Sequence, residues 1–243
     1  MFLGQCALES GEFRFVEEQD LDIPIVFSST TGAAHKSEFT NWKTDAPGQF
    51  AEWQQWDAGG RQGNGPGWQV CERWRYMYDC TSPNKWRRKQ GHDHGNDVEG
   101  DGKRYAGKGF LQITYKKNYQ LAADKLAMSE IVSRPEVVKQ YRYAALTAAC
   151  YWRYTSVAEK LDEWVRKHPE LSPNIDAASF SNLADVDSEE SFIKSTIAVN
   201  GGLTDYNRRV GYFDRARKAL GLAERYQSGL LHPGMMCTDP TLR

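Results

Sequence analysis

Apolar residues recur at the helical period through most of the chain after Tyr115, and this pattern constrains the fold more than any other feature. It predicts helices at residues 116–128, 134–154, 157–168, 188–199 and 207–220. Pro135 suits the first turn of its helix, and Gly221 follows the last helix at a position typical of a helix end. A shorter helix is predicted at 2–9, before Gly11. We therefore expect a mainly α fold.

The periodicity fails between Ser28 and about Gly102, where glycine, proline, asparagine and tryptophan accumulate. This composition predicts loops or a loop-rich subdomain. Six of the eight tryptophans lie in this stretch: Trp42, Trp53, Trp56, Trp68, Trp74 and Trp86. Tryptophan stacks on sugar rings but also anchors protein interiors, and we favour interior packing for any one of them.

The chain of 243 residues carries 31 basic and 32 acidic side chains, which give a formal net charge of −1. This balance provides no global attraction to nucleic acid or to anionic lipid. The apolar stretches are far shorter than the roughly 20 residues needed to cross a bilayer. We expect no nucleic-acid partner, no membrane partner, and one domain at 1–243 with a loop-rich insertion at about 67–98 and an extended tail at about 227–243.

The first residues read MFLGQCALE, with no basic leader and no small-residue cleavage site, so we expect no signal peptide. The protein would be made in the cytoplasm and would reach its substrate after release. The abrupt start of the first helix suggests a protein partner that completes this end, or one that binds the 67–98 insertion and the tail. Five cysteines, an odd count without repeated spacing, argue against a complete disulfide framework.

Two carboxyl groups near the start have the chemistry to split a glycosidic bond, which needs an acid for the leaving oxygen and a carboxylate for water. Glu9 ends an apolar helix, where burial would favour the protonated form that a general acid needs. Glu18 lies nine positions further, so a continuous helix would point it to the opposite side. Ser10 and Gly11 offer a break that could bring Glu18 back, and Glu17 remains a competing choice.

Residues 7–14 read ALESGEFR, which resembles the signature His-Glu-Ser/Thr-Gly-Gly-Phe of the family 19 glycoside hydrolases. In that family the glutamate is the general acid, so the resemblance implies this role for Glu9. Leu8 stands in place of the histidine, and Glu12 in place of the second glycine. Residues 16–19, VEEQ, are similar to the acidic stretch that follows the signature in bacterial and phage members, which implies that Glu18 is the general base.

The longest resemblance lies in residues 100–114, GDGKRYAGKGFLQIT, followed by Asn-Tyr at 118–119. It is similar to the family segment Gly-Asp-Gly-x-Arg-Tyr-x-Gly-Arg-Gly-x-x-Gln-Leu-Thr/Ser…Asn-Tyr, with Lys108 where the family has its second arginine. The resemblance implies that Thr114 helps the base to hold the attacking water. It also implies substrate binding by Tyr105, Gln112 and Asn118, whose polar groups can contact hydroxyl and N-acetyl groups.

Residues 197–203, IAVNGGL, and 207–213, NRRVGYF, resemble a third family segment, Ile-Asn-Gly-Gly…Asn-Arg-x-x-Tyr/Phe-Tyr. This resemblance implies that Asn200 hydrogen-bonds an acetamido group. It also implies that Arg209 binds substrate or forms an ion pair with a catalytic carboxylate. Asn200 and the glycines that follow it are also an ordinary helix C-cap.

Together these segments imply a lysozyme-like, two-lobed, mainly α domain with a small loop-rich or β elaboration, acting as an inverting hydrolase of β-1,4-linked N-acetylhexosamines. Peptidoglycan is the preferred substrate, because the signature context is that of bacterial and phage lysins, and chitin is the alternative. An alternative of another class is a weakly active or inactive glycan-binding component of a phage particle or secretion apparatus. No cofactor and no metal are expected, since the spacing of Cys71, Cys80, His92 and His94 differs from the usual zinc sites.

Nothing between Gly67 and Val98 resembles the family. The aromatic residues of this interval could pack a small subcore. Its basic residues form a locally basic stretch: Arg73, Arg75, Lys85, Arg87, Arg88 and Lys89. We expect a lobe at the rim of the cleft, or a docking surface for anionic cell-wall polymers or an acidic protein, and not a part of the catalytic core. A solubilising surface is the plainer alternative.

Overall fold

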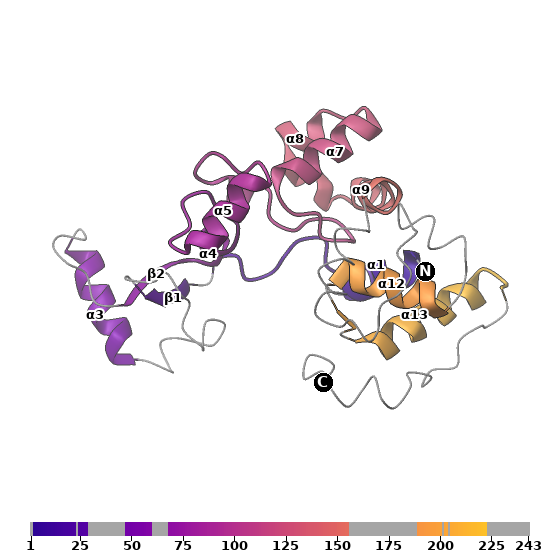
Figure 1. Cartoon of the computed structure of the whole chain (residues 1–243), viewed down its shortest axis with the longest axis horizontal. Helices are drawn as coiled ribbons and strands as arrows, with labels where there is room; N and C mark the ends of the chain where they lie inside the picture. The colour runs from indigo at the N-terminus through magenta and orange to yellow at the C-terminus, as the bar shows by residue number, and fades with distance from the viewer. Residues whose placement is uncertain are drawn as a thin grey trace. The chain divides into compact units, whose positions relative to one another are not determined.

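The computed structural model describes residues 2–22, 24–28, 47–59, 68–155, 189–200, 202–203 and 205–222. Helices predominate in these residues (Figure 1), which confirms the predicted mainly α class. The helix predicted at 157–168 and the tail at 227–243 lie outside the described residues. The chain divides into two compact units: unit 1 contains residues 1–16, 108–112 and 136–243, and unit 2 contains residues 17–107 and 113–135.

The described part of unit 1 contains four α-helices: α1 (Phe2–Glu9), α9 (Tyr141–Tyr154), α12 (Glu189–Asn200) and α13 (Tyr206–Ala219). Helix α13 packs against both α1 and α12. In their shared core the ring of Phe192 lies 5.2 Å from that of Phe213, and Trp152 meets Phe2 edge-on at 5.5 Å. This packing of aromatic rings fixes α1 against the other helices of unit 1.

The predicted helices that fall within the described residues agree with the structure to within two residues at each end, apart from the one predicted at 134–154. That stretch contains two elements, the 3₁₀ helix η1 (Pro135–Lys139) and α9. Gln140 separates them in an extended conformation, with φ −76° and ψ 134°. The prediction of one continuous helix is wrong, because apolar periodicity does not report the conformation of a single linking residue.

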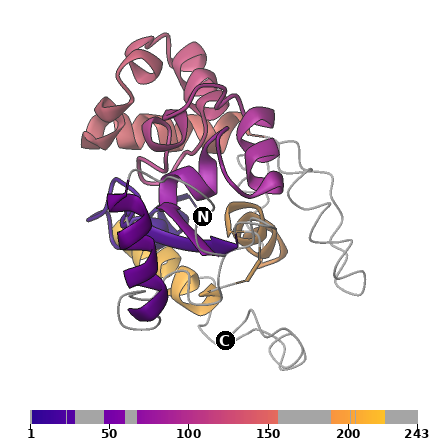
Figure 2. The ribbon, with the colours of Figure 1, turned by 90° about the vertical axis from the view of Figure 1, so that its left-hand side faces the viewer.

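Unit 2 contains a two-stranded antiparallel sheet, drawn as arrows in Figure 2, in which β1 (Pro24–Ser28) pairs with β2 (Trp68–Glu72). In its register Ile25 lies opposite Cys71. Its described helices are α3 (Pro47–Ala58), α4 (Arg73–Tyr78), α5 (Lys85–Asp93), α6 (Asp101–Arg104), α7 (Lys116–Leu126) and α8 (Glu130–Ser133). The prediction of loops throughout residues 28–102 is therefore wrong. Much of the described part of this stretch is helical or stranded.

Two helices of this stretch, α4 and α5, have only 6 and 9 residues, too few for an apolar period to be recognised. Four of the nine residues of α5 are basic. Its start is set by Asn84, whose side-chain oxygen accepts hydrogen bonds from the backbone N–H groups of Trp86 and Arg87. Helices of this length depend on caps and tertiary contacts more than on an apolar stripe. None of the helices in the described ranges is long and apolar enough to span a bilayer.

The interval 67–98 packs into unit 2 through a small core that it shares with residues before and after it. Trp74 of α4 is buried with Leu21 and Ala106, and its backbone N–H donates to the Leu21 carbonyl over 3.1 Å. Directly after α4, the buried carboxylate of Asp79 accepts hydrogen bonds from the N–H groups of Gly100 and Gly102 at 2.9 and 3.0 Å. These bonds join the interval to the glycine-rich segment, and its predicted place at the rim of a cleft stays a prediction.

Candidate active site

Glu9 is the last residue of α1, and its carboxylate forms an ion pair with Arg209 of α13. Arg209 Nη2 donates to Glu9 Oε1 over 2.6 Å. The arginine side chain is 2% exposed and the glutamate side chain 23% exposed, so the pair lies largely out of water. The structure thus contains an ion pair of the kind implied for Arg209, with Glu9 as the partner. The roles of both residues in turnover stay predictions.

A buried chain of hydrogen bonds extends from this ion pair. Arg209 Nη1 donates to Gln5 Oε1 over 2.5 Å, and Gln5 Nε2 donates to Thr196 Oγ1 over 2.9 Å. The bonds connect α1, α12 and α13 at the level of Glu9. On α9, burial and, to a smaller extent, the negative charge of Glu9 raise the pKa of Tyr151. Tyr151 is therefore a neutral phenol near Glu9 at physiological pH.

The turn that follows Glu9 explains why α1 ends there. Ser10 Oγ donates to the Cys6 carbonyl over 2.6 Å and accepts from the Phe13 N–H over 2.9 Å. Gly11 has a φ of +54°, which breaks the helix at the position predicted from the sequence. The chain therefore leaves the helix axis immediately after the carboxyl group of Glu9.

Both carboxylate oxygens of Glu18 have donors within unit 2. The Tyr78 hydroxyl donates to Oε1 over 2.8 Å, and Arg73 Nη2 lies 3.5 Å from the same oxygen. The Gly107 N–H donates to Oε2 over 3.3 Å, while the Glu18 N–H donates to the Gly107 carbonyl over 2.7 Å. The Glu18 side chain is 16% exposed. Glu18 is thus bound to the glycine-rich segment that carries the longest family resemblance.

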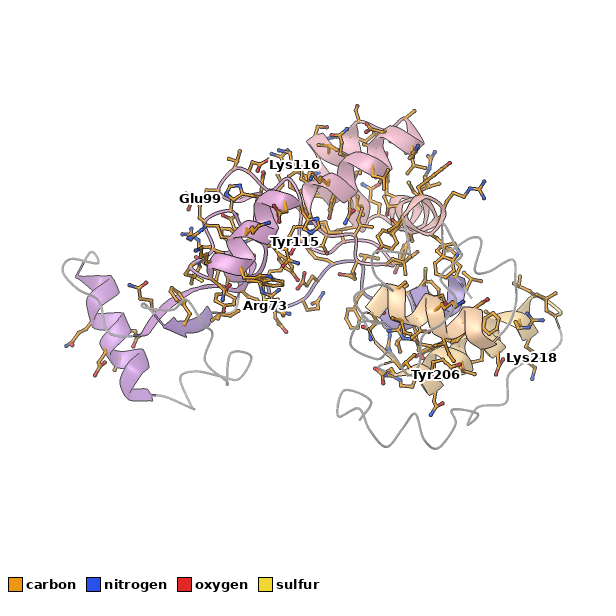
Figure 3. The ribbon with its side chains drawn as sticks, in the orientation of Figure 1. Arg73, Glu99, Tyr115, Lys116, Tyr206 and Lys218 are labelled. Atoms are coloured by element: carbon orange, nitrogen blue, oxygen red, sulfur yellow. The ribbon has the colours of Figure 1, made fainter. Side chains whose placement is uncertain are left out.

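Two tyrosines belong to the surroundings of Glu18. Burial and then the charge of Glu18 raise the pKa of Tyr78, which stays a protonated donor. The pKa of Tyr115 is raised to about 12, mainly by burial; the charge of Arg87 opposes this rise and the charge of Glu18 adds to it. Tyr115 meets Tyr78 edge-on at 5.6 Å. Figure 3 labels Arg73 at the start of α4 and Tyr115 just before α7.

Three further residues with predicted roles lie in or after the glycine-rich segment. The carbonyl of Thr114 accepts from Asn118 Nδ2 over 2.7 Å, so these two residues of unit 2 are neighbours. Gln112 belongs to unit 1, where its Nε2 donates to the Gly109 carbonyl over 2.9 Å. Gln112 has a φ of +51°, an uncommon conformation outside glycine. Substrate binding and water positioning by these residues stay predictions.

Tyr105 and Asn200 occupy contrasting positions. Tyr105 is 2% exposed, and its hydroxyl donates to the Val132 carbonyl over 3.3 Å, which is the environment of a packing residue. It also lines a surface pocket of about 540 Å³ together with Arg104 and Met128. Asn200 is the exposed last residue of α12. The predicted contact of each with substrate is not tested by these positions.

Arg73, Tyr78, Tyr115 and Tyr151 were not among the residues predicted to form the site. Arg73 and Tyr78 lie in the interval without family resemblance, more than fifty positions from Glu18. The sequence signals there were basic and aromatic composition, which we interpreted as a docking surface. A one-dimensional pattern contains no sign of a hydrogen bond between residues so far apart.

The cysteines and histidines of the 67–98 interval are not gathered into a group that could bind a metal ion, and all four are described residues. The described residues contain no group of three or more His, Cys, Asp or Glu side chains suited to a metal ion. Cys71 and Cys80 are free thiols, and burial raises the pKa of Cys71 to about 12. His92 pairs with Asp97 at 3.1 Å, and the ring of His94 stacks on Tyr115 at 4.8 Å.

No family model and no curated protein matches this chain. Among solved structures it is similar to a bacterial family 19 chitinase, at 17% identity and a TM-score of 0.46, over 93% of this chain and 74% of that chain. It is also similar to chitinase C from Streptomyces griseus, at 19% identity and a TM-score of 0.37, over 52% and 45% of the two chains. A mutant of chitinase C matches at 16% identity and a TM-score of 0.36, over 56% and 61%.

Proposed function

We propose that this chain is a glycoside hydrolase that cleaves β-1,4 bonds between N-acetylhexosamines, with peptidoglycan as its substrate. One observation supports this most: the resembling segments are joined through the side chains to which the resemblance assigns chemistry. Glu9 of the first segment pairs with Arg209 of the third, 200 positions away. Glu18 bonds to Gly107 of the second, 89 positions away. A chance resemblance gives no reason for the segments to meet at these two carboxylates.

In the proposed mechanism Glu9 is the general acid. Arg209 donates a hydrogen bond to Glu9 Oε1. In the proposed mechanism the other oxygen, Oε2, carries the proton that passes to the glycosidic oxygen. Because the same guanidinium also binds Gln5, the carboxyl group keeps one orientation while its proton leaves and returns. Tyr151, neutral nearby, adds no charge to this environment.

Glu18 is the proposed general base, which removes a proton from the attacking water, and Thr114 helps to hold that water. The donors gathered on the Glu18 carboxylate favour this residue over Glu17, because a base must be ionised and fixed in direction. An inverting enzyme separates its two carboxyl groups by roughly 6.5 to 9.5 Å, so that water fits beside the sugar.

Peptidoglycan is proposed over chitin because of the bacterial and phage character of the first segment and because of the charge of α5. This helix exposes Lys85, Arg88 and Lys89, which can attract the anionic polymers of a cell wall. Trp86 is 61% exposed beside them, with the Arg87 guanidinium 4.9 Å from its ring centre. The protein would act on the wall after release from the cell or as part of a phage particle.

The test is hydrolysis of purified bacterial walls and of colloidal chitin, followed by turbidity and by mass analysis of the new reducing ends. We expect loss of wall turbidity with N-acetylhexosamine reducing ends, and a large loss of this activity in Glu18→Gln. Faster release from chitin than from walls would exchange the proposed substrate for the alternative. Binding to walls without new reducing ends would indicate a glycan-binding component instead.

A further inference from the structure

We infer that Tyr78 and Arg73 are positioning residues that hold the Glu18 carboxylate in the orientation required for its work as general base. Both residues come from α4, inside the interval that bears no family resemblance. The inference rests on the proposed function, and it names the part of the chain that controls one of its two carboxyl groups.

The geometry at Glu18 restrains the carboxylate from two sides. Tyr78 and Arg73 approach Oε1, at 2.8 and 3.5 Å, while the Gly107 N–H approaches Oε2 at 3.3 Å. Donors at both oxygens oppose rotation about the bond to the carboxylate carbon. The Tyr78 bond is the shortest of the three, and a neutral hydroxyl bound to a carboxylate makes a strong hydrogen bond.

Tyr78 owes its own position to packing and not to Glu18. Its ring packs against the buried cluster of Leu21, Trp74 and Ala106, and Tyr115 meets it edge-on. Helix α4 is fixed at its start by the bond from Trp74 to the Leu21 carbonyl. The hydroxyl is therefore presented to Glu18 by a preformed surface, which is what a positioning residue requires.

Arg73 supplies charge at a longer distance. Its Nη1 donates to the Gln19 carbonyl over 3.4 Å, so the guanidinium binds the backbone next to Glu18 as well as the Glu18 side chain. A positive charge beside the carboxylate stabilises its ionised form, which is the form that accepts a proton from water. Tyr78 thus fixes the orientation of the Glu18 carboxylate, and Arg73 stabilises its negative charge.

The test compares Tyr78→Phe with Tyr76→Phe on a soluble N-acetylglucosamine oligomer or wall fragment, well below the melting temperature of each variant. Tyr76 is a buried tyrosine of the same helix, and its hydroxyl accepts from Asn84. We expect Tyr78→Phe to lower kcat about 10- to 100-fold, as for loss of a hydrogen bond to a charged group, with KM changed less than about twofold. Tyr76→Phe should keep kcat within about twofold.

Arg73 gives an independent comparison, because Arg73→Lys keeps the charge that Arg73→Met removes. We expect the lysine variant to retain most of the kcat and the methionine variant to lose roughly three- to tenfold. Equal kcat values in these two variants would contradict the role assigned to charge.

A melting experiment tests the contact without any substrate. Tyr78→Phe should lower the melting temperature of the natural sequence but leave that of a Glu18→Leu protein unchanged, because the hydroxyl then has no carboxylate to bind. If hydrolysis requires Glu18 but Tyr78→Phe keeps full kcat, the inference is overturned while the proposed function stands. If the natural sequence hydrolyses no glycan, both fail, even where the melting temperatures show the contact.

Discussion

At the scale of single residues, the environment of Glu9 depends on one buried guanidinium. Arg209 bonds to two side chains of α1, Gln5 and Glu9, and through Gln5 it is connected to Thr196 of α12. A buried charge with such partners contributes to stability only while all of them are present, since the loss of one leaves the others without compensation. Its removal should therefore affect folding and the candidate site together.

We predict that Arg209→Met lowers the free energy of unfolding by about 3 kcal/mol, because it leaves the Gln5 oxygen and the Glu9 carboxylate without their donor. The measurement is urea unfolding followed by circular dichroism. The control is Arg208→Met, since Arg208 is exposed and pairs with exposed Asp205 at 3.6 Å. That variant should stay within about 0.5 kcal/mol of the natural sequence. Equal losses in the two variants would show that the buried bonds contribute little.

We predict that Glu9→Gln lowers hydrolysis about 100- to 10,000-fold with an unchanged circular dichroism spectrum. An amide cannot donate the catalytic proton, but it is nearly isosteric and its oxygen still accepts from Arg209. Glu12→Gln is the matched control three residues later, where the carboxylate is half-exposed and accepts from Tyr212. A Glu9→Gln protein that is folded and nearly as active as the Glu12→Gln protein would remove Glu9 from the mechanism.

The sequence predicted some of these residue contacts and could not predict others, for a physical reason. Glu9 and Arg209 lie in segments of recognisable pattern, so the ion pair between a carboxylate and Arg209 could be anticipated. The donors on Glu18 could not, because Tyr78 reaches it through the packing of α4 on Leu21 and Ala106. Such a contact depends on the folded unit, and it produces no pattern of residue spacing in the sequence.

At the scale of elements, helices with a recognisable apolar period were predictable and the polar, capped helix α5 was not. α13 and α12 have their apolar residues at the helical period, and their predicted bounds differ little from the observed ones. α5 was missed because its start depends on the Asn84 cap and its residues are mostly polar. The break at Gln140 was missed because a single extended residue hardly disturbs a period.

Helix α5 also allows a test of the proposed attraction to anionic walls. We predict that Lys85→Glu with Lys89→Glu lowers adsorption to purified walls at low salt, and that the difference disappears near 1 M salt, where charges are screened within about 3 Å. Lys125→Glu with Lys218→Glu changes the net charge equally from exposed positions on other helices. Equal losses of adsorption in a sedimentation assay would mean that net charge matters and α5 does not.

The junction between α4 and α6 makes a prediction about stability. A Cβ at Gly102 would lie 2.9 Å from backbone atoms of Asp79, whose carboxylate also binds the Gly102 N–H. Gly102→Ala should therefore lower the free energy of unfolding by about 1–3 kcal/mol. At Gly211 in α13 a Cβ meets nothing within 4 Å, so Gly211→Ala should raise it by about 0.5–1 kcal/mol. Chemical denaturation of both variants measures the two signs, and a stabilising Gly102→Ala would show that this junction is loosely packed.

At the scale of the whole molecule, the proposed hydrolysis requires that Glu9 as acid and Glu18 as base act on the same glycosidic bond. Glu9 has its fixed environment in unit 1, and Glu18 has its own in unit 2. In each unit these hydrogen bonds hold the carboxyl group in one orientation. An inverting reaction follows only if water, directed by Glu18, attacks the face opposite to the bond that Glu9 protonates.

The most direct measurement of this claim is proton NMR of the first products released from a soluble β-1,4-linked N-acetylglucosamine oligomer or wall fragment, before mutarotation. The new reducing end should appear as the α-anomer, and Glu9→Gln and Glu18→Gln should each release at least about 100-fold less product at the same enzyme concentration. A β-anomer would indicate retention of configuration and contradict Glu18 as general base, and the absence of any new reducing end from the natural sequence would contradict hydrolysis itself.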